Sequence, residues 1–136
     1  PFIVSWPGRI NTPGGLVRQP SHLIDIMATL CDIGQSDYPA SWKGKPITPS
    51  QGVSLRPLLE GQPFTRSEPI YWQWRKGRAI RKNQWKLVSH GGPWELYDIA
   101  KDRTEMRDVS HLQAGVTRHL ADLWEKWAEE VGLRER

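Results

Sequence analysis

Residues 70–98 constrain the fold most, because they contain four short apolar segments separated only by brief turns. The predicted strands are Ile70–Trp74, Arg78–Arg81, Trp85–Val88 and Trp94–Asp98. Aromatic and aliphatic side chains alternate along them, which is typical of strands with one buried face. Asn83 lies in one of the turns and tolerates the positive φ that a tight hairpin requires. The segment therefore predicts a four-stranded antiparallel meander.

A long amphipathic helix is predicted after the meander, from near Ser110 to Gly132. Its apolar side carries Leu112, Val116, Leu120, Leu123, Trp124 and Trp127. Gly115 weakens the first turns by ~1 kcal/mol relative to alanine. Burial of the apolar side chains outweighs this cost at ~1.5–3 kcal/mol each. We expect the helix to cover the meander, so the predicted class is α+β.

The first part of the chain predicts elements of an α/β domain instead of an antiparallel sheet. Phe2–Trp6 is apolar at nearly every position, as expected of a strand buried on both faces in a mainly parallel sheet. A helix is predicted over residues 21–33, with Ser21 as the N-cap and Gly34 as a left-handed terminator. Its apolar face, which we expect to pack on a sheet, consists of Leu23, Ile26, Met27, Leu30 and Ile33.

These two elements lack partners, because nothing else in the chain has the pattern of a parallel strand. We therefore expect residues 1–34 to be the terminal strand and helix of a truncated α/β domain whose start lies upstream of Pro1. Residues 35–69 are rich in Pro, Gly, Ser and Lys and predict an irregular connecting segment with one helical turn near 53–59. Residues 70–136 form the predicted antiparallel-sheet subdomain with the final helix.

Composition limits the possible partners. The formal net charge is +4 at pH 7, and the basic residues are scattered rather than clustered, which mildly favours anionic ligands. No nucleic-acid motif is present, and no segment approaches the ~20 apolar residues of a membrane span. Cys31 is the only cysteine, which excludes an intrachain disulfide and a multi-cysteine metal site. We expect neither a nucleic-acid partner nor a membrane partner.

Short motifs occur in a specific order over residues 1 to 128. They are Pro1-Phe2-Ile3-Val4-x-Trp6-Pro7-Gly8, His22-Leu23-Ile24-Asp25-Ile26-x-x-Thr29-Leu30, Gly52-Val53-Ser54-Leu55-x-Pro57-Leu58-Leu59-x-Gly61, Tyr71-Trp72, Arg78-Ala79-Ile80-Arg81, Trp85-Lys86-Leu87-Val88 and Glu95-Leu96-Tyr97-Asp98-x-x-x-Asp102-x-x-Glu105. In this order they resemble the sulfatase (arylsulfatase) family of the alkaline-phosphatase-like superfamily. The first three resemble the segment that follows its catalytic core, and the others resemble its C-terminal subdomain.

The resemblance implies a large α/β catalytic domain followed by a small domain with a four-stranded antiparallel sheet and a long helix. It also implies a formylglycine nucleophile, made from a Cys or Ser in a Cys/Ser-x-Pro/Ala-x-Arg motif, and a divalent cation, usually Ca²⁺, held by Asp and Asn oxygens. In the family these elements precede the part that resembles this chain. Cys31 does not replace the nucleophile, because Asp32-Ile33-Gly34 follows it. We therefore expect no catalytic residue, metal site or cofactor here, only in the parent.

The expected partners are the N-terminal catalytic domain of the same protein and, in the parent, a sulfated small molecule or carbohydrate. Truncation would leave an apolar patch around residues 2–6 and 21–33 that favours self-association. Family resemblance places the parent in the periplasm or outside the cell, although the residues themselves leave the compartment open.

The candidate substrate-binding residues are Gln73, Trp74, Arg78 and His90. Many relatives carry Glu-His and then Gly-Asn near the first of these, so Gln73 and Trp74 depart from the family pattern. Arg75, Lys76 and Arg78 would attract a sulfated anion, and the imidazole of His90 would donate to a sulfate oxygen. The alternatives are a solvated hairpin turn and an exposed loop histidine.

Other polar residues predict structural roles. His22 suits helix-end packing, and His111 and His119 suit the surface of the last helix. The acids Asp98, Asp102 and Glu105 suit turns and caps, because their spacing lacks the glycine and the bidentate acid of a calcium loop.

Three hypotheses about function remain open at this point. The chain is the C-terminal fragment of a sulfuric ester hydrolase, which completes the fold, shapes substrate access and is inactive alone. Alternatively it is a stand-alone module that binds sulfated or anionic carbohydrate through Trp72, Trp74 and Trp94, or a nucleic-acid binder with salt-dependent affinity. Exposed tryptophans favour the binding module, and tryptophans buried between the sheet and the last helix favour the hydrolase fragment.

Overall fold

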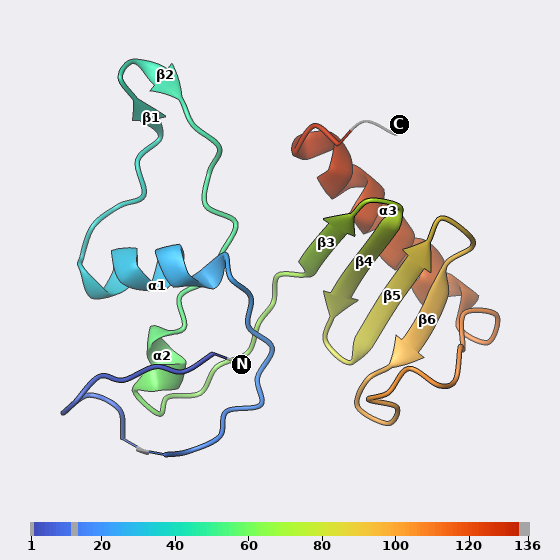
Figure 1. The fold of residues 1–136 in the computed structure, drawn as a ribbon, viewed down its shortest axis with the longest axis horizontal. Helices are drawn as coiled ribbons and strands as arrows, with labels where there is room; N and C mark the ends of the chain where they lie inside the picture. The colour runs from blue at the N-terminus through green and yellow to red at the C-terminus, as the bar shows by residue number, and fades with distance from the viewer. Residues whose placement is uncertain (1, 12–13, 134–136) are drawn as a thin grey trace. The chain divides into compact units, whose positions relative to one another are not determined.

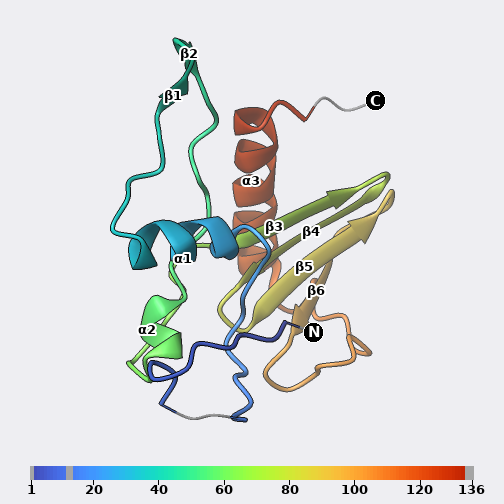
Figure 2. The ribbon, with the colours of Figure 1, turned by 60° about the vertical axis from the view of Figure 1, so that its left-hand side comes forward.

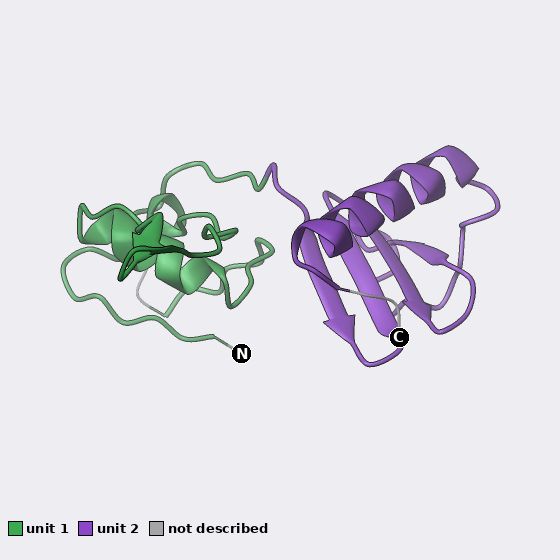
Figure 3. Cartoon of the chain, turned by 90° about the horizontal axis from the view of Figure 1, so that it is seen from above, with its two compact units in different colours: residues 1–66 green, residues 67–136 purple. Residues whose placement is uncertain are grey.

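The computed structural model describes residues 2–11 and 14–133 and divides into two compact units, 1–66 and 67–136 (Figure 3). Pro1, the first residue of the motif at the start of the chain, lies outside the described residues. Among the described residues, none of the helices has the length and apolar character needed to cross a membrane.

The second unit contains the predicted meander (Figure 1). Its strands are β3 (Ile70–Trp74), β4 (Gly77–Lys82), β5 (Trp85–His90) and β6 (Glu95–Asp98), and each pairs antiparallel with the next. The β3–β4 and β4–β5 turns use positive φ at Arg75 and Asn83, 53° in both cases. The prediction of a four-stranded antiparallel sheet is confirmed, with β5 extending to His90 because its pairing with β4 continues to Gly77.

Helix α3 (Ala114–Glu130) covers one face of this sheet, as predicted (Figure 1). The register aligns Ile80, Leu87 and Leu96 in one row across three strands, and each is fully buried. Leu120, Trp124 and Ala128 of α3 pack against this row. The core of the second unit therefore forms from residues within it.

The start of α3 differs from the prediction. Residues 110–113 form turns, because Asp108 accepts hydrogen bonds from the amide and hydroxyl of Ser110 and the carbonyl of Val109 accepts one from the amide of Gln113. The helix thus begins at Ala114 rather than near Ser110. Leu112, predicted on the buried face, is 59% exposed as a consequence.

The predicted strand over Phe2–Trp6 is wrong for this structure, which shows no ladder over those residues. A strand needs hydrogen-bonded neighbours, and the described part of the chain supplies none to this segment. Phe2 and Ile3 are 58% and 89% exposed.

The ends of the first helix also differ. Helix α1 spans Asp25–Ile33, and Ser21 does not cap it, because the carboxylate of Asp25 accepts the hydrogen bond from the amide of His22 in the preceding turn. Gly34 has a right-handed φ of −78°, so it is not the left-handed terminator, and the positive φ of 52° falls on Gln35.

The predicted apolar face of α1 is only partly covered: Ile26 and Ile33 are half-buried, whereas Leu23, just before the helix, Met27 and Leu30 are mostly exposed. At 100° per residue, Leu23, Met27 and Leu30 share one side and Asp25 and Thr29 share the opposite side. The polar pair is buried, whereas the three apolar side chains are 77%, 51% and 58% exposed. Leu23, Met27 and Leu30 therefore give the first unit an exposed apolar side at α1.

The polar side of α1 binds the segment that leads into α2 (Arg56–Leu59). Asp25 accepts hydrogen bonds from the amide of Val53 and from both Nη atoms of Arg66, and Thr29 accepts one from the amide of Leu55. The remaining element is a small hairpin, β1 (Ser41–Trp42) and β2 (Lys45–Pro46), within the predicted irregular segment.

Candidate functional site

The sheet brings the four candidate residues to one end. The register pairs Gln73 with Arg78, Trp74 with Gly77, and Gly77 with His90. The site consists of the β3–β4 turn and the β5–β6 loop, and we call it the sheet-end site. A Cβ on Gly77 would lie 3.4 Å from Nδ1 of His90, so the histidine ring lies against the strand backbone.

The guanidinium of Arg78 makes its contacts with other side chains of the second unit. Its guanidinium lies 4.3 Å from the ring centroid of Trp94 and 5.5 Å from that of Trp124. It also donates from Nη1 to Glu125 of α3 at 3.1 Å. These contacts link the end of the sheet to α3, and the predicted anion contact of Arg78 stays a prediction.

The other members of the sheet-end site face solvent. Trp74 is 75% exposed, and the guanidinium of Arg75 lies 5.7 Å from its ring centroid. Gln73 donates from Nε2 to the carbonyl of Arg75 at 2.5 Å and holds the turn. Lys76 and His90 are exposed beside them. The exposed cationic side chains near the indole of Trp74 are thus Arg75 and Lys76, with His90 at the same end of the sheet.

The burial of the tryptophans gives a mixed answer on the two hypotheses, the hydrolase fragment and the carbohydrate-binding module. Trp124 is buried between sheet and helix, and its indole donates to the carbonyl of Trp72 at 3.2 Å. Trp72 and Trp94 are half-buried, and Trp94 packs against Trp124 at 5.8 Å between ring centroids. Trp74 alone of the three proposed platforms presents most of its surface to solvent.

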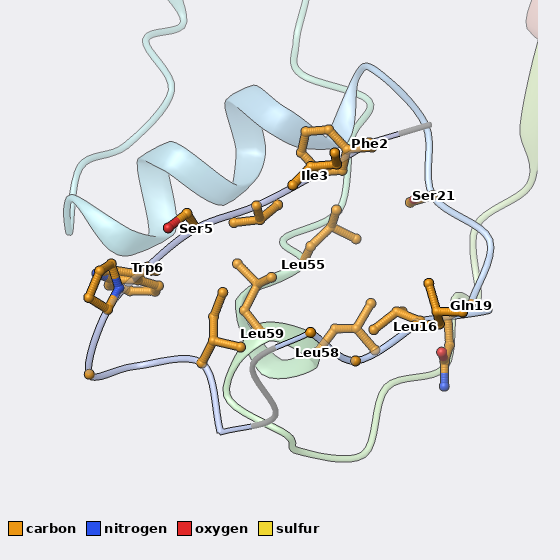
Figure 4. A pocket seen from close by; sticks show the side chains of 17 residues that line it. Phe2, Ile3, Ser5, Trp6, Leu16, Gln19, Ser21, Leu55, Leu58 and Leu59 are labelled. Carbon is orange, nitrogen blue, oxygen red and sulfur yellow. The ribbon is translucent and has the colours of Figure 1, made fainter.

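The first unit contains an apolar hollow of about 640 Å³ (Figure 4). Phe2, Ile3 and Trp6 line it from the opening segment, and Leu55, Leu58 and Leu59 line it from around α2. Its lining side chains are mostly apolar, and Ser5, Gln19 and Ser21 are the polar ones among them. Such a hollow suits an apolar protein surface better than a sugar.

A pattern of the formylglycine type does occur in this hollow, at Ser5-Trp6-Pro7-Gly8-Arg9. Here Pro7 and Gly8 form a turn in which the amide of Arg9 donates to the carbonyl of Trp6 at 3.1 Å. Arg9 lies over the Trp6 ring, 5.8 Å from its centroid. Across the described residues, no group of three His, Cys, Asp or Glu side chains is placed to hold a metal ion. The residues present therefore do not fit the metal-dependent site of the family, and no catalytic step is derived from Ser5.

The acids near the end of the meander hold turns. Asp98 accepts from the amide of Ala100, and Asp102 accepts from the amides of Met106 and Arg107, both at 2.8 Å. Glu105 has a positive φ of 57° and pairs with Lys86. The predicted turn and cap roles are confirmed for Asp98 and Asp102.

Two features of the molecule were absent from the sequence-based prediction. One is the outward orientation of the apolar face of α1, for which periodicity carries no signal. The other is the β1–β2 hairpin, whose signal was present in Trp42-Lys43-Gly44-Lys45, since x-Gly between two extended segments is typical of a tight hairpin.

Comparison with known proteins supplies the family. The model of the family described as N-sulphoglucosamine sulphohydrolase, C-terminal, matches residues 1–130. The Delta 4,5-hexuronate-2-O-sulfatase of Bacteroides thetaiotaomicron is 29% identical over 124 residues, 81% of this chain and 24% of that protein. An uncharacterized sulfatase of Schizosaccharomyces pombe is 23% identical over 146 residues, 98% of this chain and 25% of that protein.

A similar fold occurs in a solved structure, that of Ps i-CgsB in complex with k-i-k-neocarrahexaose. The TM-score is 0.67 at 25% identity, over 82% of this chain and 25% of that one. The chain thus spans about a quarter of the length of these three relatives.

Proposed function

Because this chain belongs to the sulfatase family defined by the C-terminal region of N-sulphoglucosamine sulphohydrolase, we propose that it is the C-terminal part of a sulfuric ester hydrolase. In this proposal it completes the fold and shapes substrate access, and it is inactive alone. The nucleophile and the divalent cation belong to a catalytic domain that the remaining three quarters of such relatives would supply.

The observation that carries this proposal is the exposure of apolar side chains at helix α1. Its apolar side, Leu23, Met27 and Leu30, is mostly exposed, and so are Phe2 and Ile3 of the opening segment. Large apolar side chains exposed in this way are typical of a place where another protein surface packs. A catalytic domain of the same polypeptide is the partner that the family supports.

The proposed substrate is a sulfated carbohydrate. The sheet-end site supports this class, because the exposed face of Trp74 suits a sugar ring and the cations of Arg75 and Lys76 suit sulfate oxygens. Gln73 holds the turn, His90 borders it, and Arg78 braces the sheet beneath it. The names of the sulfatase relatives are consistent with this class.

The direct test measures inorganic sulfate released from a panel of sulfated mono- and oligosaccharides by the purified chain. We expect none, because the described residues supply neither the nucleophile nor the metal ligands. Sulfate release by the chain alone, without added protein, would refute the proposal.

A second test addresses the open apolar surface. Light scattering should show concentration-dependent self-association of the chain, which the double variant M27K/L30E should reduce. The matched control is Met106→Glu, since Met106 is 83% exposed but lies in the second unit. A wild-type chain that stays monomeric at high concentration would contradict the proposed docking surface.

The alternative function, a stand-alone module for sulfated or anionic carbohydrate, is favoured by one observation, the 75% exposure of Trp74. It predicts binding of sulfated oligosaccharide by a monomeric chain that does not self-associate. Light scattering therefore separates it from the first proposal, whereas both functions predict no sulfate release by the chain alone.

A further inference from the structure

The β1–β2 hairpin carries an exposed indole beside two lysines, and we infer that it is a second binding site for a sulfated sugar, distinct from the sheet-end site. In Figures 1 and 2 the hairpin stands away from α1 at the end of two irregular stretches of chain. This inference goes beyond the proposed function, because binding here requires no hydrolysis.

The backbone of the hairpin fixes which side chains share a face. Trp42 pairs with Lys45, and the ladder continues where the amide of Ile47 donates to the carbonyl of Ala40 at 3.1 Å. Lys43 and Gly44 between them have φ of 49° and 76°, the two positive values of a type I′ turn. Directly opposite residues of an antiparallel pair point to one side. The indole of Trp42 and the ammonium group of Lys45 therefore lie on the same face.

The chemistry of this face suits one class of ligand. Trp42 is 66% exposed, so a broad apolar surface is open to the C–H face of a pyranose. Lys45 beside it and Lys43 at the tip supply positive charge for a sulfate group on the same sugar. Residues 38–59 contain no acid, and within the described part of the chain neither lysine has an ion-pair partner.

The same local pattern occurs at the tip of the β3–β4 turn. There Trp74, 75% exposed, precedes Arg75 with φ of 53° and Lys76. In both hairpins an exposed tryptophan is the last residue before a two-residue turn whose first residue is basic and left-handed. The two tips therefore present the same chemistry, an exposed indole beside a basic turn residue, and this chemistry suits a sulfated sugar.

The experiment titrates the full chain with a sulfated oligosaccharide and follows the indole N–H resonance of Trp42 by nuclear magnetic resonance. The resonance is assigned by its loss in Trp42→Phe, and circular dichroism checks that each variant keeps its fold. Parallel titrations use the desulfated form of the same oligosaccharide and a poly-glutamate peptide as the anionic control.

We expect the sulfated sugar alone to shift the Trp42 resonance. Trp42→Ala should weaken the binding measured at the hairpin amides about tenfold, the loss of one stacking platform. Trp42→Phe should retain most of it. The double variant K43Q/K45Q should abolish the preference for the sulfated form, whereas Trp74→Ala and Lys101→Gln should leave the Trp42 shift unchanged.

Three outcomes would overturn the inference. These are no shift of the Trp42 resonance, equal shifts with the desulfated sugar, and an equal shift with poly-glutamate, which would indicate docking of an acidic protein instead. Failure of the proposed function is distinguishable, because a chain that belongs to an inactive parent would still bind the sugar at Trp42.

Discussion

Replacing Asp25 with alanine should destabilise the first unit by about 3–5 kcal/mol, the usual cost of removing one partner of a buried ion pair. The side chains of Asp25 and Arg66 are 0% and 5% exposed, and the shortest distance between Oδ1 and Nη2 is 2.6 Å. The carboxylate also accepts from the amides of His22 and Val53, at 2.7 and 3.0 Å. Asp25→Ala would leave a buried guanidinium without its counter-charge and two amides without their acceptor.

The assay is amide hydrogen exchange, because it reports local opening in each unit separately. Asp25→Ala should lower the protection of Thr29–Ile33 in α1, or remove it, while the amides of β5 keep theirs. The matched control is Lys101→Ala, whose ion pair with Asp98 is on the surface with the lysine 86% exposed. Such pairs contribute ~0–1 kcal/mol.

A double substitution tests the physical reason itself. If the penalty comes from an uncompensated charge, D25L/R66M should cost less than Asp25→Ala, since both ions are replaced together. A loss in Asp25→Ala no larger than that of Lys101→Ala would refute the reasoning. So would a double variant that is less stable than the single one.

Four further predictions follow from local geometry. Gly52→Ala should abolish protection in α1, because a Cβ there would lie 2.1 Å from a backbone oxygen, whereas Gly115→Ala, with nothing within 4 Å, should stabilise α3 by ~1 kcal/mol in urea unfolding. Burial would raise the pKa of Asp108, but hydrogen bonds from the amides of Leu96 and Ser110 and from the Ser110 hydroxyl outweigh it and lower that pKa from its ordinary value of 3.8. The stabilising effect of this carboxylate is therefore complete above pH 3.8 and is lost as the pH falls through the lowered pKa, and in Asp108→Asn this acid-dependent loss should shrink. The hydrogen bond to Glu95, with burial, raises the pKa of Tyr97 from 10.0 to about 12, so this contribution is lost as pH rises through about 12, and phenolate absorbance should show earlier titration in Glu95→Gln.

The meander could be predicted from sequence because its determinants are local. Turn residues such as Asn83 and the alternation around Leu87 specify both the strand ends and the buried face. The role of Arg78 could not be predicted in this way. Its partner Glu125 lies 47 residues along the chain, and the indoles around it come from a loop and from α3.

The errors in the first unit have another origin. Periodicity identified which residues of α1 share a side, but it cannot tell whether a surface covers that side. The helix instead buries its polar side, where Ser54 donates to Asp32, lowering the pKa of that carboxyl, and Thr29 accepts from Leu55. A strand over Phe2–Trp6 likewise depends on neighbours that the described residues do not supply.

The exposed side of α1 leads to a prediction about the proposed catalytic domain. Leu23, Met27 and Leu30 together expose about two side chains' worth of apolar surface, and covering it would contribute roughly 3–6 kcal/mol. This is comparable to the ~3–5 kcal/mol expected for removing one partner of the buried Asp25–Arg66 pair, so a covering surface should stabilise α1 about as much as Asp25→Ala would destabilise it. We expect amides of α1 to exchange at least a hundredfold more slowly in a longer polypeptide that includes the catalytic domain, roughly 3 kcal/mol, while β5 amides change little. Because the core of the second unit forms from its own residues, equal slowing in both units would show that the partner acts on the whole chain and not through the open face of α1.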